Sequence, residues 1–313
     1  MKKKTLALTA LALVAVLALS ACGSSKMTMG TGGTTGTYYG FGQVLATEIK
    51  ADADIDVTVV STGGSAANIQ GIDAGDYQLA TVQSDVMAYA YNGEKLFEEP
   101  IETFATLGGL YAEAVQLITV DPSITTVADL AGKSVSIGDN GSGVYFNAID
   151  VLAGAGLTED DIKPQYQSFG DSTEALKDGK IDAAFVVAGA PTPAITELAA
   201  TKGVYFINID GDVLANILSN CPYYTEYTIP AGTYGSDQVE DITTITVKAT
   251  MIVSADADED DVYEITKSIF ESAGSLAHDK ASELSLENAT SGMAVPFHAG
   301  AAKYYAEQGI TVN

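Results

Sequence analysis

Residues 27–40 have the sequence MTMGTGGTTGTYYG, in which a short strand pattern is followed at once by a glycine-rich turn. Val44, Leu45 and Ile49 then recur at the spacing of one helical face, so we expect a helix after Gly40. Glycine lets the backbone turn sharply and lets neighbouring groups approach it closely. The segment therefore predicts a strand, a small-residue turn and a helix, in that order.

The same unit recurs four more times along the chain. The predicted strands and the turns and helices that follow them are Asp56–Ser61 with Thr62–Ser65 and a helix bearing Asn68 and Ile69, Gln78–Val82 with Gln83–Asp85 and a helix from Val86, Lys133–Ile137 with Gly138–Gly143 and the helix Val144–Ala153, and Ala183–Val187 with Gly189–Pro191. We expect Pro191 in the first turn of the last helix, a favourable position for proline. Such alternation predicts an α/β fold with largely parallel sheets.

These turns place the N-termini of several helices after the carboxyl ends of the strands. The first N–H groups of a helix have no partner inside the helix, and together they carry about half a positive charge. They can therefore hold a carboxylate or phosphate without a cationic side chain. The chain contains no Arg, so the backbone is the most available means of holding an anion. In open α/β sheets these strand ends also line ligand clefts.

Composition narrows the class of protein. The chain has 313 residues, a formal net charge of −26 and 47% hydrophobic residues, which is enough to build a core and suggests two domains. A strongly acidic chain is a poor partner for nucleic acid, because binding phosphates needs a basic face. Two Cys cannot form a disulfide framework or a thiolate zinc site.

The N-terminus has the pattern of a lipoprotein signal. Three Lys at positions 2–4 precede the apolar run Leu6–Leu19, which ends in Leu-Ser-Ala-Cys at residues 19–22. We expect residues 1–21 to be removed, Cys22 to be lipidated and residues 22–26 to form an anchor and short linker. Multiple acyl chains give stable membrane attachment. The alternatives are an ordinary secretory signal with a chance Cys and, less favoured, a transmembrane anchor.

Motifs for catalysis and metal binding fail on inspection. The Gly30 turn has Thr35 where a dinucleotide fingerprint needs its third Gly, and the chain has no P-loop motif. Ser142 lacks the Gly two residues before it that a nucleophile elbow requires, since residue 140 is Asn. The acidic run 256–260 departs from a calcium loop at Asp261 and is better explained as the first turn of a helix. We expect neither an enzyme nor a metal or cofactor site.

A set of motifs resembles the TAXI family of solute-binding proteins of TRAP transporters. The matching segments are Thr31–Gly33 with Gly36–Tyr39, Thr62–Ser65 with Asn68, Gln83–Asp85, Leu110–Glu113, Asp129–Gly138, Gly141–Gly143, Asp178–Phe185, Val262–Lys267 and Pro296–Ala301. They follow one another in order over nearly the whole chain beyond the N-terminal signal. One departure is Ala299, where the family usually has Pro.

The resemblance implies a two-lobed periplasmic-binding-protein-like fold of type II, in which each lobe is a mostly parallel sheet flanked by helices. Lobe 1 would comprise residues 27–115 with 250–313, and lobe 2 residues 116–249. Hinge strands would join the lobes. The β-rich runs Gln116–Val120 and Thr244–Val253 independently fit two such crossings.

The resemblance also gives candidate ligand contacts, which are Gly33, Thr37, Tyr39, Ser65, Asn68, Gln83, Asp85, Tyr111, Glu113 and Ser142. Backbone and hydroxyl groups of the first loop would meet a carboxylate, and Gln83 and Asp85 an amino or hydroxyl group. Tyr111 would cover the ligand, and Ser142 would come from the opposite lobe. Asp85 can equally be a helix N-cap, and Glu113 can equally anchor the hinge.

The implied function is capture of a small carboxylate or amino acid, glutamate-like or a 2-oxoacid, outside the cytoplasm. The protein would deliver this ligand to a membrane-embedded TRAP permease, from the outer face of the cell membrane. One alternative is a receptor subunit that presents a small solute to a sensor partner. Another is an enzyme that acts on a small acid in a cleft, which would need an acid–base pair that no motif supplies.

Overall fold

The computed structural model describes residues 25–313, and the expected signal and the lipidation site Cys22 lie outside these residues. The strands are β1 (Lys26–Gly30), β2 (Asp56–Val60), β3 (Leu79–Gln83), β4 (Phe104–Thr119), β5 (Ser134–Ser136), β6 (Lys163–Gln165), β7 (Ala183–Ala188), β8 (Tyr205–Ile207), β9 (Thr225–Ile229) and β10 (Ile242–Ser254). Each strand that the repeated unit predicts is present, with ends that differ by at most one residue. The first begins at Lys26, inside the expected linker.

The α-helices of the described residues are α2 (Thr37–Ala53), α3 (Ser65–Asp73), α4 (Ser84–Asn92), α5 (Val144–Gly154), α6 (Phe169–Lys177), α7 (Pro193–Ala199), α8 (Gly211–Asn220), α9 (Glu259–Glu271), α10 (Leu286–Thr290) and α11 (Ala299–Glu307). Three short 3₁₀ helices accompany them, η1 (Val127–Leu130), η2 (Glu159–Asp161) and η3 (Asp279–Glu283). None of these helices is long and apolar enough to cross a membrane.

The helix boundaries correct two expectations. The first helix begins at Thr37, earlier than expected, so Tyr38 and Tyr39 belong to it. Pro191 precedes its helix, and Pro193 occupies the first turn of α7 instead. The acidic run 256–260 does start a helix, since the Asp258 side chain accepts hydrogen bonds from the backbone N–H groups of Asp260 and Asp261.

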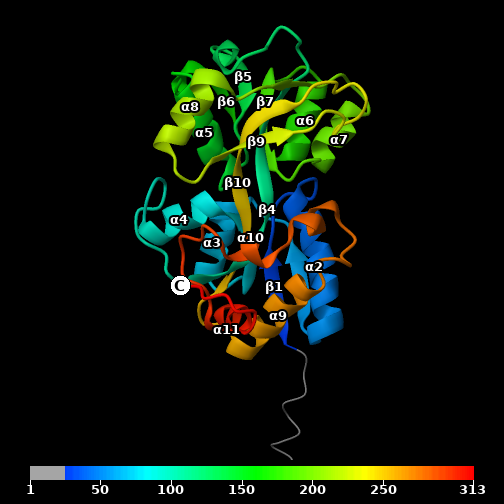
Figure 1. Cartoon of the computed structure of the whole chain (residues 1–313). Coiled ribbons are helices and arrows are strands. Elements are labelled where there is room, and N and C mark those ends of the chain that lie inside the picture. The colour runs from blue at the N-terminus through cyan, green and yellow to red at the C-terminus, as the bar shows by residue number, and fades with distance from the viewer. Residues whose placement is uncertain (1–24) are drawn as a thin grey trace, which may run out of the picture.

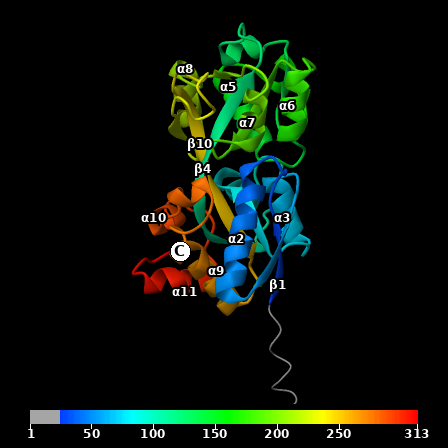
Figure 2. The same cartoon turned by 90° about the vertical axis from the view of Figure 1, so that its right-hand side faces the viewer.

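The molecule has two lobes, joined by β4 and β10 (Figure 1). Lobe 1 contains β1–β3 with α2–α4 and α9–α11, and lobe 2 contains β5–β9 with α5–α8. The turned view shows the two lobes stacked along the same axis, with β4 and β10 between them (Figure 2). The expected crossing strands are therefore present, and each of them runs through both lobes.

The strands of both lobes form one sheet in the order β2-β1-β3-β10-β4-β7-β5-β6, with β8 on β4 and β9 on β10. The outer strands are parallel, as expected for the repeated unit, whereas β4 and β10 are antiparallel to each other and to their other neighbours. The register of β4 and β10 shifts between Ala249 and Thr250 and again between Met251 and Ile252. Such irregularities bend strands, and these lie where the strands enter lobe 1.

Each lobe has its own apolar core. One cluster of lobe 1 joins the N-terminal segment to the C-terminal helices, with Met29, Leu45, Ile265 and Tyr305 fully buried. Lobe 2 packs a separate cluster, in which Phe185 is fully buried. The burial of Leu45 and Ile49 confirms the helical face that their spacing predicts, and Val44 packs at its margin.

Candidate functional site

A cavity of about 60 Å³ lies between the lobes. A cavity needs on the order of 10–15 Å³ to hold one water molecule, so this cavity has room for a few small groups. Its wall in lobe 1 comes from the turns after β1, β2 and β3 and from β4, and its wall in lobe 2 from the segments around α5, α6 and the end of β7. The repeated strand–turn–helix unit therefore places the ends of its strands on this cavity.

The two lobes touch on both sides of the cavity. On one side, Thr37 Oγ1 donates to the carbonyl oxygen of Gly189 at 3.1 Å, and Ala194 N–H donates to the carbonyl oxygen of Thr35 at 3.2 Å. On the other side, the backbone N–H groups of Ala66 and Ala67 both donate to Gly141 O. These contacts define a closed arrangement of the lobes.

An aromatic contact extends this closure. Phe146 on α5 of lobe 2 packs between lobe 1 rings, with centroid distances of 5.7 Å to Tyr89 and 6.5 Å to Phe97. Phe146 consequently belongs to an apolar cluster otherwise built by lobe 1. Closure therefore buries apolar surface as well as forming hydrogen bonds.

Glycine allows the closest approach between the lobes. A Cβ atom on Gly143 of lobe 2 would overlap the side-chain oxygen of Gln83 in lobe 1. A Cβ atom on Gly63 would lie 2.8 Å from the carbonyl oxygen of Asn140, closer than real Cβ contacts allow. A side chain at either position would therefore keep these two turns from meeting as closely as they do.

Asn147 on α5 links the lobes beside the cavity. Its side-chain nitrogen donates to Asp85 Oδ2 at 2.9 Å and to Tyr224 Oη at 2.8 Å, and its side-chain oxygen accepts from Gln83 Nε2 at 3.0 Å. Tyr224 in turn donates to Asp150 Oδ2 at 3.0 Å. The sequence did not predict a role for Asn147, because that role depends on which residues of lobe 1 meet α5.

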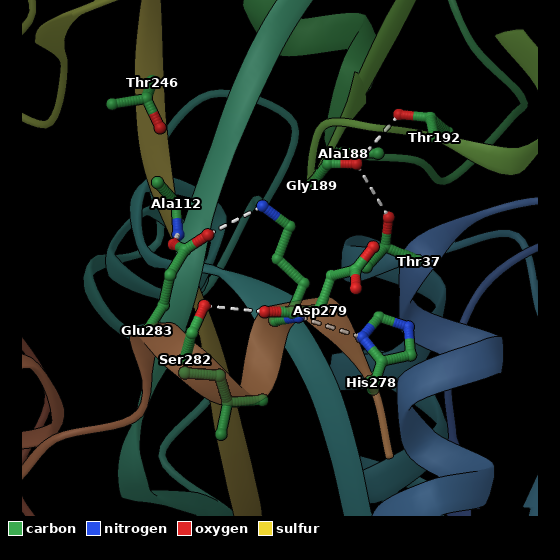
Figure 3. A network of polar contacts seen from close by, with 12 residues as sticks. Thr37, Ala112, Ala188, Gly189, Thr192, Thr246, His278, Asp279, Ser282 and Glu283 are labelled. Carbon is green, nitrogen blue, oxygen red and sulfur yellow. Dashed lines mark hydrogen bonds and ion pairs between the residues drawn. The ribbon is translucent and has the colours of Figure 1, made fainter. Parts of the chain in front are cut away.

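A second network lies where η3 packs against β4, on the Thr37 side (Figure 3). Lys280 is buried and its Nζ lies 2.7 Å from Glu283 Oε1, while Glu283 Oε2 accepts from Ala112 N–H at 2.8 Å. The Lys280 Nζ atom also lies 5.9 Å from the centre of the Tyr111 ring. Its charge is therefore compensated by Glu283, and Lys280 does not line the cavity.

Six of the ten candidate ligand contacts line the cavity, namely Gly33, Thr37, Ser65, Gln83, Glu113 and Ser142. The other four do not. Asn68 is used inside lobe 1, where its side chain bonds Thr31 O, Thr81 O and Thr62. Tyr39 is replaced on the wall by Tyr38, because successive helical residues point in different directions.

Asp85 and Tyr111 are buried beside the cavity without lining it. Asp85 lies in the first turn of α4, and the N-cap of that helix is Gln83, so Asp85 is not the N-cap. It also does not line the cavity, as a ligand contact would. It faces Asn147 instead. Tyr111 packs its ring against Phe41 at a centroid distance of 5.7 Å.

Five polar atoms of the cavity residues are buried without a hydrogen-bond partner among the described residues. They are Tyr38 Oη, Gln83 Oε1, Glu113 Oε2, Ser142 Oγ and Gln167 Oε1. Buried polar groups normally have partners, and leaving one unsatisfied costs roughly 1–3 kcal/mol. Their concentration around one cavity indicates that a polar ligand supplies the missing partners. Tyr38 lies in the matching segment Gly36–Tyr39 but was missed because its direction depends on where α2 begins, and nothing in the local sequence marks Gln167.

Two buried acids beside the cavity have raised pKa values. Burial raises the pKa of Glu113 to about 8, an increase that the nearby Tyr38 and Gln83 side chains partly offset. Burial likewise raises the pKa of Asp85 to about 7, although the Val86 backbone and Asn147 favour its charged form. Perturbed groups of this kind are concentrated at functional sites. No cluster of three or more His, Cys, Asp or Glu suited to a metal ion occurs within residues 25–313.

Comparison with solved structures supports the fold. The alkanesulfonate-binding protein SsuA from Xanthomonas axonopodis pv. citri, bound to MOPS, is 18% identical with a TM-score of 0.54, over 91% of this chain and 85% of that one. A putative L-cystine ABC transporter protein from Listeria monocytogenes is 15% identical with a TM-score of 0.51, over 83% and 94%. An ancestral arginine-binding protein bound to arginine is 16% identical with a TM-score of 0.51, over 83% and 97%.

These likenesses confirm the expected α/β fold of the type II periplasmic-binding-protein kind. At this level of identity they concern the fold alone. The family is established separately, by a match that spans nearly all of the described residues. Residues 29–309 match the NMT1-like family, and the chain belongs to it.

Proposed function

We propose that this protein is the extracytoplasmic solute-binding protein of a TRAP-type transporter. It captures a small carboxylate or amino acid between its lobes and delivers it to the membrane permease. The observation that carries the proposal is the closed inter-lobe cavity with five unpartnered polar atoms. Solved proteins of the same fold are described as binding alkanesulfonate and arginine, which are small solutes.

The wall of the cavity suits a ligand with a carboxylate. Gly36, Thr37 and Tyr38 bring the N-terminus of α2 to it, and Gly143 and Val144 bring that of α5. Neither helix has a side-chain cap, so N–H groups of both first turns are open to a ligand. Two such ends can hold an anion in a chain that has no Arg.

The transport partner and the membrane attachment are parts of the same proposal. The lipid on Cys22 would keep the protein at the outer face of the cell membrane, within reach of the permease. The TAXI motifs support a TRAP permease. A sensor partner remains the alternative, and reconstitution with each candidate membrane protein in lipid vesicles would discriminate the two.

Thermal unfolding against a ligand panel tests the binding function. The panel contains glutamate, glutamine, 2-oxoglutarate, aspartate, succinate and branched-chain 2-oxoacids. A ligand at 100 times its Kd should add about 2.7 kcal/mol and raise the Tm by several degrees. A flat response after denaturation and refolding, which removes carried-over ligand, would contradict the proposal. Conversion of any member into a product would indicate an enzyme instead.

A further inference from the structure

The charged side chains that line the cavity are all acidic. Glu113 and Asp139 are the two, and none of the lining residues is Lys, Arg or His. Glu113 has the stronger claim on a ligand, because it is 2% exposed and its Oε2 atom has no hydrogen-bond partner. Asp139 accepts from the neighbouring Asn140 N–H and lies partly in solvent. The lining of the cavity therefore offers an ionisable acceptor and no cationic side chain, and Lys280, which lies near Glu113 behind the wall, is paired with Glu283.

The orientation of Gln83 is fixed by its partners and adds a second acceptor. Tyr224 donates its proton to Asp150, so its oxygen accepts from the Asn147 amide nitrogen. The oxygen of Asn147 must then face Gln83, which donates to it through Nε2. This leaves Gln83 Oε1 as the atom without a partner, buried and next to Gly143. A ligand at this position must supply hydrogen-bond donors.

The wall of the cavity thus presents two kinds of polar group close together, since Gln83 Oε1 lies beside the N-cap Gly143 of α5 and Glu113 lies near Tyr38 in the first turn of α2. The uncapped first turns of α2 and α5 present N–H donors, whereas Glu113 and Gln83 present oxygen acceptors. A zwitterion matches both kinds of group, because its carboxylate accepts and its ammonium group donates. A 2-oxoacid has a carbonyl oxygen in place of the ammonium group. That oxygen cannot donate a hydrogen bond to Glu113 or Gln83.

We propose that Glu113, together with the oxygen of Gln83, determines specificity by selecting an α-amino acid over the corresponding 2-oxoacid. This inference rests on the proposed function and narrows the class of ligand. It also moves amine recognition from Asp85, which faces Asn147, to Glu113, which faces the cavity.

Several groups lie near Glu113 and interact with its charge. They are Tyr111 on β4 itself and, on other elements, Tyr38 on α2, Gln83 at the end of β3, Asp85 on α4 and Lys280 on η3. An amino acid requires the ionised carboxylate, whereas a 2-oxoacid is tolerated only when Glu113 is protonated and can donate. Because burial raises the pKa of Glu113, discrimination should be stronger at pH 8.5 than at pH 6.5.

The experiment is calorimetric titration of the full chain in mild detergent, at both pH values, with matched pairs of ligands. The pairs are L-alanine with pyruvate, L-2-aminobutyrate with 2-oxobutyrate, and L-glutamate with 2-oxoglutarate. For the pair that binds best, we expect the amino acid to bind at least tenfold more tightly at pH 8.5. The Glu113→Gln variant should lower the ratio of the 2-oxoacid Kd to the amino acid Kd at least tenfold. The Asp85→Asn variant, which removes the other buried acid, should keep this ratio.

The outcomes separate the claims. Equal or tighter binding of the 2-oxoacid by the unmodified protein would overturn the inference and leave the proposed function intact. A ratio lost in Asp85→Asn but kept in Glu113→Gln would overturn the assignment to Glu113. Binding of no member of any pair would overturn the inference and count against the proposed function. If Glu113→Gln does not fold, the change in ratio between the two pH values of the unmodified protein decides.

Discussion

The two walls of the cavity are built differently. Lobe 1 supplies three of the five unpartnered polar atoms, on Tyr38, Gln83 and Glu113. Lobe 2 supplies the other two, on Ser142 and Gln167, together with small and apolar residues. The contrast indicates that lobe 1 carries most of the ligand recognition, while lobe 2 excludes water and strengthens the polar contacts of lobe 1. Four predictions test this division of roles.

The largest effect should come from adding a methyl group to the wall of lobe 2. In Gly143→Ala the new Cβ would overlap Gln83 Oε1 and prevent closure, although the backbone of Gly143 (φ −70°) suits alanine. We expect ligand affinity to fall by at least about 100-fold, which corresponds to about 2.7 kcal/mol. Calorimetry measures this change, and small-angle scattering should find the lobes open at ligand concentrations that close the unmodified protein.

The matched control is Gly274→Ala, where an added Cβ meets no atom within 4 Å. Its affinity should equal that of the unmodified protein. If Gly143→Ala bound as tightly as this control, the close approach of the two walls would not be required for binding.

The next effect concerns lobe 1 and pH. The pKa of Glu113 is raised from 4.5 in the unfolded chain to about 8, so the folded state holds this proton more tightly. Folding stability should therefore be highest below about pH 4.5 as far as Glu113 is concerned, and fall as pH rises toward 8. A difference of one pKa unit between the folded and unfolded chain corresponds to about 1.4 kcal/mol of folding free energy. Opening of the cleft lets water reach the carboxylate and reduces the effect, so we expect the free energy of unfolding to fall by about 1–3 kcal/mol over this pH range.

Glu113→Gln removes this titration, so its ligand-free stability should fall less between pH 5 and 8. Denaturant unfolding at several pH values gives the comparison. Asp85, with its pKa raised from 3.8 to about 7, contributes in the same direction, and both curves retain that contribution. If the free energy of unfolding depended on pH in the same way in the two proteins, folding would not raise the pKa of Glu113.

A smaller effect compares one hydroxyl from each wall. Ser142→Ala in lobe 2 removes an unpartnered hydroxyl, so it should weaken binding by roughly 1–3 kcal/mol if a charged ligand group meets it, and leave ligand-free stability unchanged. Ser65→Ala removes the acceptor for Gln83 N–H and should lower stability as well. Calorimetry and denaturant unfolding of both variants give the two readings. Unchanged affinity in both variants would contradict this placement of the ligand.

The smallest effect is expected at the edge of the interface. Thr37→Val removes the hydroxyl that donates to Gly189 O across the lobes. A single neutral hydrogen bond contributes about 0.5–1.5 kcal/mol, so affinity should fall by about two- to tenfold. Thr47→Val, which removes a hydroxyl that bonds Gln43 O within α2, serves as the control. Equal affinities in the two variants would mean that the Gly189 contact does not stabilise closure.

The sequence predicts those parts of the molecule that depend on local pattern. The repeated strand–turn–helix unit identifies β1, β2, β3, β5 and β7, and the β-rich runs identify β4 and β10 as crossings. Gly33, Thr37 and Gln83 reach the cavity because each lies at a strand–helix turn. Local sequence could not place Tyr38 ahead of Tyr39, since this depends on where α2 begins. Asn147 bonds lobe 1 and Gln167 lines the cavity, and both positions follow only from the packing of the two lobes.

The crossing strands also bear on the order in which the two lobes can fold while the chain is being synthesised. The apolar cluster of lobe 2 draws on residues from Val115 to Val247, whereas a cluster of lobe 1 needs Met27 as well as Tyr305. Lobe 2 can thus complete its core before the last helices have been synthesised. Lobe 1 must wait for the C-terminal segment, so its half-built sheet is the part of the growing chain that is most exposed to aggregation.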